Sequence, residues 1–100
     1  MHCSVWRFTG DPEELERGYF ALTEQIPATT HVLHAAAKTP DGLLIFDTCP
    51  SEKAYREFFG SEDVQALFAA HGLADAAVED FPVIRAYAAR EEVTAATWGS

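Results

Sequence analysis

Hydrophobic and polar positions alternate along the chain with two periods, one typical of strands and one typical of helices. β-Branched and aromatic side chains over residues 3–8 predict a strand that ends at a glycine-containing turn. Apolar residues then recur at steps of three and four over residues 12–26, which predicts a helix. We expect Asp11 to be its N-cap, Pro12 its first residue, and the proline at position 27 to end it.

The middle of the chain predicts a β-hairpin. Residues 30–38 begin with β-branched side chains, and a turn sequence at residues 39–42 separates them from the apolar run over residues 43–48. A helix is the alternative for the alanine-rich part, because alanine is the best helix former. The hairpin is favoured because that part is short and a turn with a second apolar run follows it.

The second half predicts a broken helix and a last strand. Ser51 is the expected cap of a helix that ends near Gly60, and a third helix over residues 64–71 ends before a glycine. Residues 77–88 alternate loosely, with Pro82 inside, which predicts a strand at an edge or with a bulge. The order strand, helix, strand, strand, broken helix, strand is the ferredoxin-like βαββαβ arrangement, an α+β fold with helices on one face of an antiparallel sheet.

Composition adds expectations about organisation and partners. One hundred residues with 48% hydrophobic content predict one domain, over residues 1–90, with residues 91–100 as a flexible tail. The two middle strands are apolar on both faces, so we expect the open face of the sheet to pair with a second copy in a homodimer. The net charge of −9 argues against nucleic acid and anionic membranes as partners.

The cysteines and the hydrophobic runs predict a cytoplasmic protein. The chain has two cysteines, which form no CxxC pair, so we expect reduced thiols and neither a zinc finger nor a disulfide framework. No leader-like segment and no apolar stretch of about 18 residues is present, which indicates neither secretion nor a membrane span.

Three stretches of the sequence resemble the dimeric α+β barrel superfamily, which holds antibiotic-biosynthesis-type monooxygenases and small polyketide cyclases. They are VWRFTGDPEELERGYFAL, DGLLIFDTCPSEKAYREFF and VEDFPVIRAY. The resemblance implies a homodimer with sheets face to face, an apolar pocket between sheet and helices, and catalysis without metal or organic cofactor. It places His2 at a pocket histidine of the first strand, and Tyr19 and Phe20 at aromatic positions of the first helix. The tyrosine and histidine that perform cyclisation in the plant-type cyclases would fall near Phe58 and Val64.

His31 and His34 have the HxxH spacing of many metal sites. In a strand, residues three apart point to opposite faces, so these imidazoles could not share one ion, and we expect no metal site. His34 is flanked by alanines that leave space, and it is the candidate general acid or base of the pocket. The alternative for His34 is a hydrogen-bonded side chain of the core or dimer interface, and His31 is expected at a surface or an interface.

Further candidates follow from the alternation of side chains along the strands. Arg85 and Tyr87 share a face of the last strand and could stabilise an enolate or phenolate oxygen, although Arg85 could instead pair with an acidic residue. Asp47 could orient a histidine or act as a base, and it could instead cap the next helix or pair with an arginine. Trp6 shares a face with Ser4 and would serve either as a wall for a planar substrate or as core.

These considerations define the expected site. The expected catalytic residues are His34, His2, Arg85 and Tyr87, and the expected substrate-binding residues are Trp6, Ser4, Tyr19, Phe20, Phe46 and Phe58. The leading hypothesis is a cofactor-independent enzyme that cyclises or oxygenates an acidic carbon of a small hydrophobic or aromatic, polyketide-like substrate. The alternatives are a non-catalytic dimer that binds a hydrophobic ligand or assists other enzymes, and a haem- or peroxide-handling relative with an axial histidine.

Overall fold

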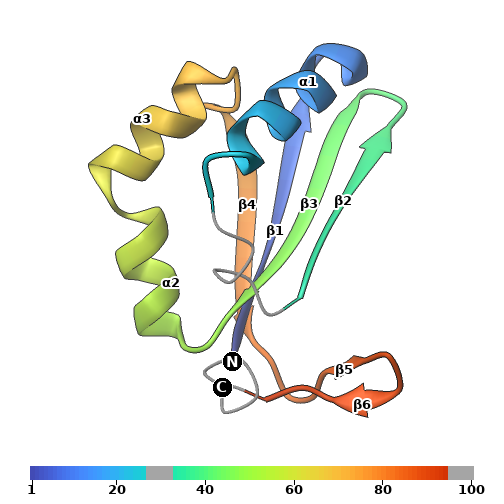
Figure 1. Ribbon diagram of the computed structural model, residues 1–100, viewed down its shortest axis with the longest axis vertical. Helices are drawn as coiled ribbons and strands as arrows, with labels where there is room; N and C mark the ends of the chain where they lie inside the picture. Colours follow the sequence, from blue (N-terminus) through green and yellow to red (C-terminus); the bar gives the residue numbers. More distant parts are fainter. Residues whose placement is uncertain (27–32, 95–100) are drawn as a thin grey trace.

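A four-stranded antiparallel sheet in the order β2-β3-β1-β4 carries helices on one face (Figure 1). The structure is a computed structural model that describes residues 1–26 and 33–94. The strands are β1 (His2–Thr9), β2 (His34–Thr39), β3 (Gly42–Cys49) and β4 (Ala76–Pro82), and the helices are α1 (Pro12–Thr23), α2 (Glu52–Phe59) and α3 (Glu62–Ala70). This topology confirms the predicted ferredoxin-like α+β fold. None of the helices in the described ranges is both long and apolar enough to cross a membrane.

Helices α1 and α2 begin at the predicted caps, whereas α1 ends at Thr23, three residues before its predicted end at residue 26. The side chain of Asp11 accepts a hydrogen bond from the backbone N–H of Glu13 at 3.3 Å, and Ser51 accepts one from Ala54 at 3.0 Å. Gly72 follows α3 with a φ of 76°, in the left-handed region that glycine adopts without strain. Each of these features is set by residues adjacent in the chain.

The β2–β3 hairpin determines which side chains meet on the sheet. Thr39 pairs with Gly42 across a two-residue connection, and counting back along both strands pairs His34 with Asp47. Leu33 extends this pairing, because its backbone N–H donates a hydrogen bond to the hydroxyl of Thr48 at 2.8 Å. The predicted hairpin is confirmed over residues 34–48, whereas its expected start at residues 30–32 lies outside the described residues.

A row of polar side chains crosses the sheet on the face that the helices cover. Asp47 of β3 pairs with His34 of β2 on one side and with Ser4 of β1 on the other. Ser4 in turn pairs with Asp80 of β4. Side chains at directly paired positions project from the same face, so the four polar groups lie beneath the helices.

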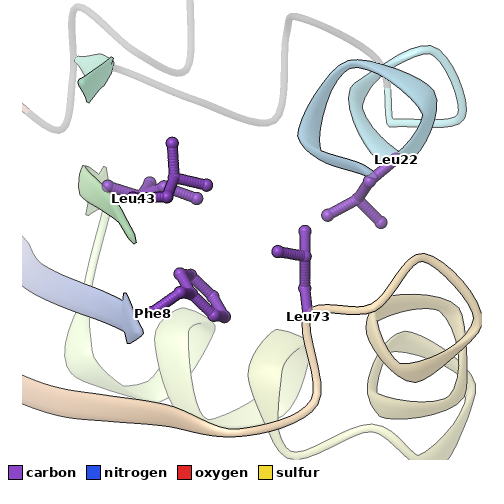
Figure 2. Close-up of a cluster of buried hydrophobic side chains, with 5 residues drawn as sticks. Phe8, Leu22, Leu43 and Leu73 are labelled. Atoms are coloured by element: carbon purple, nitrogen blue, oxygen red, sulfur yellow. The ribbon is translucent and has the colours of Figure 1, made fainter. Parts of the chain in front are cut away.

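The hydrophobic core lies between α1 and the sheet, where five side chains expose 2–7% of their surface: Phe8, Leu22, Leu43, Ile45 and Leu73. Figure 2 shows Leu22 of α1 and Leu73 of the loop after α3 pointing toward Phe8 and Leu43 of the sheet. Burying each such side chain contributes about 1.5–3 kcal/mol. The loop after α3 therefore helps to hold α1 over the sheet.

Helix α1 approaches the end of α3 closely at Gly18. A Cβ atom added at Gly18 would lie 2.2 Å from the backbone carbonyl oxygen of His71, so only glycine permits this contact. The side-chain nitrogen of Gln25 lies 2.8 Å from Nε2 of the same His71, which provides a second link. The contact at Gly18 sets the position of Tyr19, the next residue of α1.

The last strand is shorter than predicted. β4 ends at Pro82, and residues 87–88 form β5 (Tyr87–Ala88), which pairs with β6 (Glu91–Glu92) in a separate two-stranded sheet. The prediction of one strand to residue 88 is wrong, because the partner strand β1 begins at His2, opposite Pro82. One further backbone hydrogen bond, from Val83 N–H to the carbonyl oxygen of Met1 at 2.9 Å, follows Pro82, so the missing N–H of the proline is not what ends the pairing. Ala89 and Arg90 both adopt positive φ values, as a two-residue hairpin turn requires.

Candidate functional site

A small cavity lies between α1, the sheet and the two following helices. Its volume is about 30 Å³, which is room for about one water molecule. The side chains that line it are Trp6, Tyr19, Leu22, Thr23, Ile26, His34, Ile45, Asp47, Phe58, Phe59 and Phe68. The lining is mostly apolar. One of its polar residues, Thr23, donates its hydroxyl to the backbone oxygen of Phe20 at 3.2 Å, and the other three, Tyr19, His34 and Asp47, we call the polar triad.

Tyr19 and His34 are joined by a short hydrogen bond. Tyr19 Oη lies 2.6 Å from Nε2 of His34, and the two rings are nearly parallel, with an interplanar angle of 6°. Burial raises the pKa of Tyr19, and the negative charge of Asp47 raises it further. Tyr19 therefore keeps its proton at neutral pH and donates it in this hydrogen bond.

Asp47 lies behind His34 on the adjacent strand. Its Oδ1 is 3.5 Å from Nδ1 of His34 and accepts the backbone N–H of Thr48 at 2.9 Å. Only 3% of Asp47 is exposed. A carboxylate on this side favours the imidazole tautomer that carries its proton on Nδ1, which leaves Nε2 to accept from Tyr19. The polar triad thus places a hydroxyl, an imidazole and a carboxylate in the order that activates hydroxyl groups in many enzymes.

An aromatic wall, formed by Trp6, Phe59 and Phe68, closes another side of the cavity. The ring of Trp6 lies 4.8 Å from that of Phe59 and 5.6 Å from that of Phe68. The indole N–H of Trp6 donates to Oγ of Ser4 at 2.8 Å, and Ser4 is almost completely buried. Ser4 therefore lies behind the wall and fixes the orientation of Trp6.

His2 belongs to a separate polar cluster on the same face of the sheet. Its Nε2 lies 2.8 Å from Oδ1 of Asp80, and Arg56 donates to both carboxylate oxygens of Asp80, at 2.7 and 3.0 Å. The hydrogen bonds from Arg56 and then from His2 lower the pKa of Asp80. The ring of Tyr55 lies 5.3 Å from that of His2. His2, expected to act as a base in the pocket, is not among the residues that line the cavity.

Four other expected site residues also lie away from the cavity. Arg85 and Tyr87 follow the end of β4 and are exposed, with Nε of Arg85 3.5 Å from a carboxylate oxygen of Glu92. Phe20 is 59% exposed, because it is turned by about 100° from Tyr19 on the helix. Phe46 alternates with the buried residues of β3 and projects from the sheet face opposite the helices.

Four of the expected residues do line the cavity: Trp6, Tyr19, His34 and Phe58. Phe59 and Phe68 were missed, since nothing in the spacing of α2 and α3 identifies the side chains that face β1. The contact between His34 and Asp47, in contrast, can be predicted from the sequence of the hairpin. The two-residue connection at Pro40 and Asp41 implies this pairing once the hairpin is accepted.

The described residues bring together no group of three histidine, cysteine, aspartate or glutamate side chains that could hold a metal ion. His31, the other member of the HxxH sequence, lies outside the described residues. Cys3 and Cys49 are free thiols. Burial, followed by the charge of Asp47, raises the pKa of the Cys49 thiol to about 11, so this thiol is protonated and unreactive at neutral pH.

Comparison with known proteins yields a similarity of fold. No family profile matches the chain, and no curated protein matches it. Among solved structures, the chain is similar to SnoaB, a cofactor-independent oxygenase from Streptomyces nogalater that was solved as a point mutant. The TM-score is 0.62 and the identity 18%, over 85% of this chain and 94% of the other. At this identity the likeness shows a shared fold, and it agrees with the α+β arrangement described above.

Proposed function

We propose that the protein is a small enzyme that removes a proton from an acidic carbon of an aromatic or polyketide-like molecule, without a metal or organic cofactor. The observation that carries this proposal is the polar triad, with its 2.6 Å hydrogen bond between Tyr19 and His34, in an otherwise largely apolar cavity. A few convergent polar groups in an apolar pocket are typical of small-molecule sites. SnoaB, which shares the fold, is itself a cofactor-independent oxygenase.

Tyr19 is the member of the polar triad that would meet the substrate. Its raised pKa makes a free phenolate rare at neutral pH, so Tyr19 would act together with His34. The phenol oxygen takes the proton from the substrate carbon while the phenol proton passes to Nε2 of His34. The imidazolium that forms is stabilised by the carboxylate of Asp47, 3.5 Å from Nδ1.

The resulting carbanion has two outcomes that need no cofactor. In cyclisation it attacks a carbonyl carbon of the same molecule, and the alkoxide takes back the proton held by His34. In oxygenation the carbanion passes one electron to O₂, and the resulting carbon radical and superoxide combine to a peroxide anion. This anion takes the proton held by His34, and the hydroperoxide then loses water. The net change is then CH₂ + O₂ → C=O + H₂O. The shared fold with an oxygenase favours the second outcome.

We also infer a homodimer in which the open faces of two sheets pack together. This face carries the half-buried Val5 and Phe46 near its centre, and Phe81, which is 51% exposed, on β4. Apolar side chains at these positions favour burial against a second copy. Light scattering after gel filtration should give twice the chain mass for the wild type and a single chain mass for Phe46→Lys. A monomeric wild type would contradict the inference.

A non-catalytic binding protein is the second candidate. The small volume and largely apolar lining of the cavity favour it, because both are compatible with holding a hydrophobic ligand without converting it. In that case the polar triad would orient the ligand through hydrogen bonds only. The two candidates therefore differ in whether the protein exchanges a substrate proton.

Deuterium exchange tests the proton-transfer step by itself. Anthrone has a CH₂ group made acidic by two aryl rings and a carbonyl, and its exchange in D₂O under argon can be followed by ¹H NMR. We expect the protein to accelerate exchange, and Tyr19→Phe and His34→Ala to lower the rate by about 10²–10⁴-fold. Tyr87→Phe is the matched control, because Tyr87 is exposed on β5 and lies away from the cavity.

Two results would contradict the proposal. One is an exchange rate with the wild type no higher than that with free imidazole at the same concentration, which would favour the binding protein. The other is full exchange activity in a folded Tyr19→Phe variant. If exchange occurs, oxygen uptake in air distinguishes oxygenation from simple proton transfer.

A further inference from the structure

The cavity beside the polar triad is too small for the proposed substrates. An apolar cavity of about 150 Å³ is known to hold benzene, whereas this one measures about 30 Å³. An aromatic ring can therefore reach Tyr19 only if a part of the cavity wall moves.

Two larger clefts meet the cavity at the same place. The α3 cleft measures about 250 Å³ and is lined by Trp6, Phe59, Val64, Gln65 and Phe68, among others. The α2–β4 cleft measures about 350 Å³, and its lining includes Tyr55, Arg56, Val78 and Asp80. Trp6 and Phe59 line the cavity and both clefts. These two side chains therefore separate the polar triad from the larger spaces.

Of these two side chains, Phe59 is held by ring contacts alone, whereas Trp6 also makes a hydrogen bond. Trp6 is held by its hydrogen bond to Ser4 on β1, a strand paired on both sides. Phe59 is the last residue of α2, and the helix ends at Gly60 before α3 begins (Figure 1). The N-cap of α3, Ser61, makes no side-chain capping hydrogen bond. Rotation of the Phe59 ring therefore breaks ring contacts but no hydrogen bond.

The α3 cleft is better suited than the α2–β4 cleft to hold an apolar ring. Phe68 lines both the cavity and the α3 cleft, and its ring lies 6.1 Å from that of Phe59, so an aromatic surface continues from one to the other. In the α2–β4 cleft, Arg56 and Asp80 form an ion pair with a shortest distance of 2.7 Å. Covering that pair with an apolar ring would remove water from two charges, which is costly.

We infer that Phe59 determines which substrates reach the polar triad, and that the α3 cleft holds the rings of a planar, multi-ring substrate that extend beyond the reacting ring. This inference rests on the proposed function. Rotation of Phe59 joins the cavity to the α3 cleft, and the additional rings of the substrate then pack on Phe68 and Val64. Gln65 donates to the backbone oxygen of Phe59 at 3.3 Å and offers an amide to a hydroxyl or carbonyl group at the far end.

Ligand binding to matched variants tests the inference without requiring turnover. The probes are anthraquinone, with three fused rings, and phenol, with one, and binding is read from the fluorescence of Trp6 in a Trp98→Phe background. We expect Val64→Phe, which fills the α3 cleft, to weaken anthraquinone binding at least tenfold and to leave phenol binding unchanged. Val78→Phe, which fills the α2–β4 cleft, is the control and should bind both probes as the wild type does.

Phe59→Ala tests the moving side chain itself. The shortened side chain should leave the cavity open to the α3 cleft, so association with anthraquinone should become faster in stopped-flow measurements. Gln65→Phe narrows the same cleft from an exposed position and replaces Val64→Phe if that variant does not fold.

Three results would overturn the inference: loss of anthraquinone binding in Val78→Phe alone, equal binding in all variants, or no binding of anthraquinone to the wild type. Tyr19→Phe separates this inference from the proposed function. If that variant binds anthraquinone normally and exchanges anthrone protons at the wild-type rate, the proposed chemistry fails while the assignment of the cleft stands.

Discussion

Replacing Gly18 by alanine tests whether the contact between α1 and α3 sets the position of Tyr19. The new Cβ atom would lie 2.2 Å from the carbonyl oxygen of His71, far inside any normal contact. This oxygen belongs to the backbone at the end of α3, so it cannot rotate away as a side chain would. Helix α1 must therefore shift by roughly 1 Å, which displaces Tyr19 from its 2.6 Å hydrogen bond with His34.

Opposing contributions determine the expected change in stability. Alanine in a helix interior is more favourable than glycine by about 1 kcal/mol. Overpacking costs about 1–3 kcal/mol, and loss of the hydrogen bond between Tyr19 and His34 about 1 kcal/mol more. Since the unfavourable contributions are larger, we expect Gly18→Ala to lower the free energy of unfolding by about 1–3 kcal/mol and to slow anthrone exchange.

Urea unfolding, followed by tryptophan fluorescence and circular dichroism, measures this change. Gly10→Ala is the matched control, because its Cβ would meet Leu15 at 3.5 Å, an ordinary contact. We expect the control to be neutral or slightly stabilising, since alanine restricts the unfolded chain. A Gly18→Ala variant about 1 kcal/mol more stable than the wild type would refute the reasoning, because helix propensity alone would then account for the effect.

Three further predictions concern the core and the two polar clusters. Leu73→Ala should lower the free energy of unfolding by about 2–5 kcal/mol in urea titrations, because Leu73 is 2% exposed in the core. Asp47→Asn should lower the pKa of Tyr19, since it removes the charge that adds to the effect of burial, and absorbance at 295 nm would follow this titration. The lowered pKa of Asp80 means that its contribution to stability is present above the pKa of an unfolded aspartate, about 3.9, and is lost as the pH falls through the folded value. Arg56→Gln removes the hydrogen bonds that are the main cause of this lowered pKa. The free energy of unfolding should therefore fall less between pH 6 and pH 3 in the variant than in the wild type, and an equal fall would contradict this assignment.

The sequence predicts one contact of the polar triad that strand alternation alone does not, namely the pairing of His34 with Asp47. The two-residue connection at Pro40 and Asp41 pairs His34 with Asp47, whereas strand alternation alone predicts a role for each of the two residues separately. The last strand shows the opposite case. Pro82 predicts an edge position or a bulge, and one strand over residues 77–88 would place Arg85 and Tyr87 on the same face, but β4 ends at Pro82 and Tyr87 belongs to β5.

The sequence by itself determined the order of the elements up to β4 and the hairpin register. Helix caps, a left-handed glycine, apolar periodicity and short turns act between neighbouring residues, so their effects can be inferred without knowledge of the rest of the fold. They predict the α+β fold that the structure shows and place His34 on a strand that forms part of the site.

Only the tertiary structure decided which side chains from separate elements meet. Tyr19 reaches His34 because Gly18 allows α1 to approach α3, and Phe59 meets Trp6 because α2 lies over β1. These contacts depend on how closely whole helices pack on the sheet, and no local spacing encodes those distances.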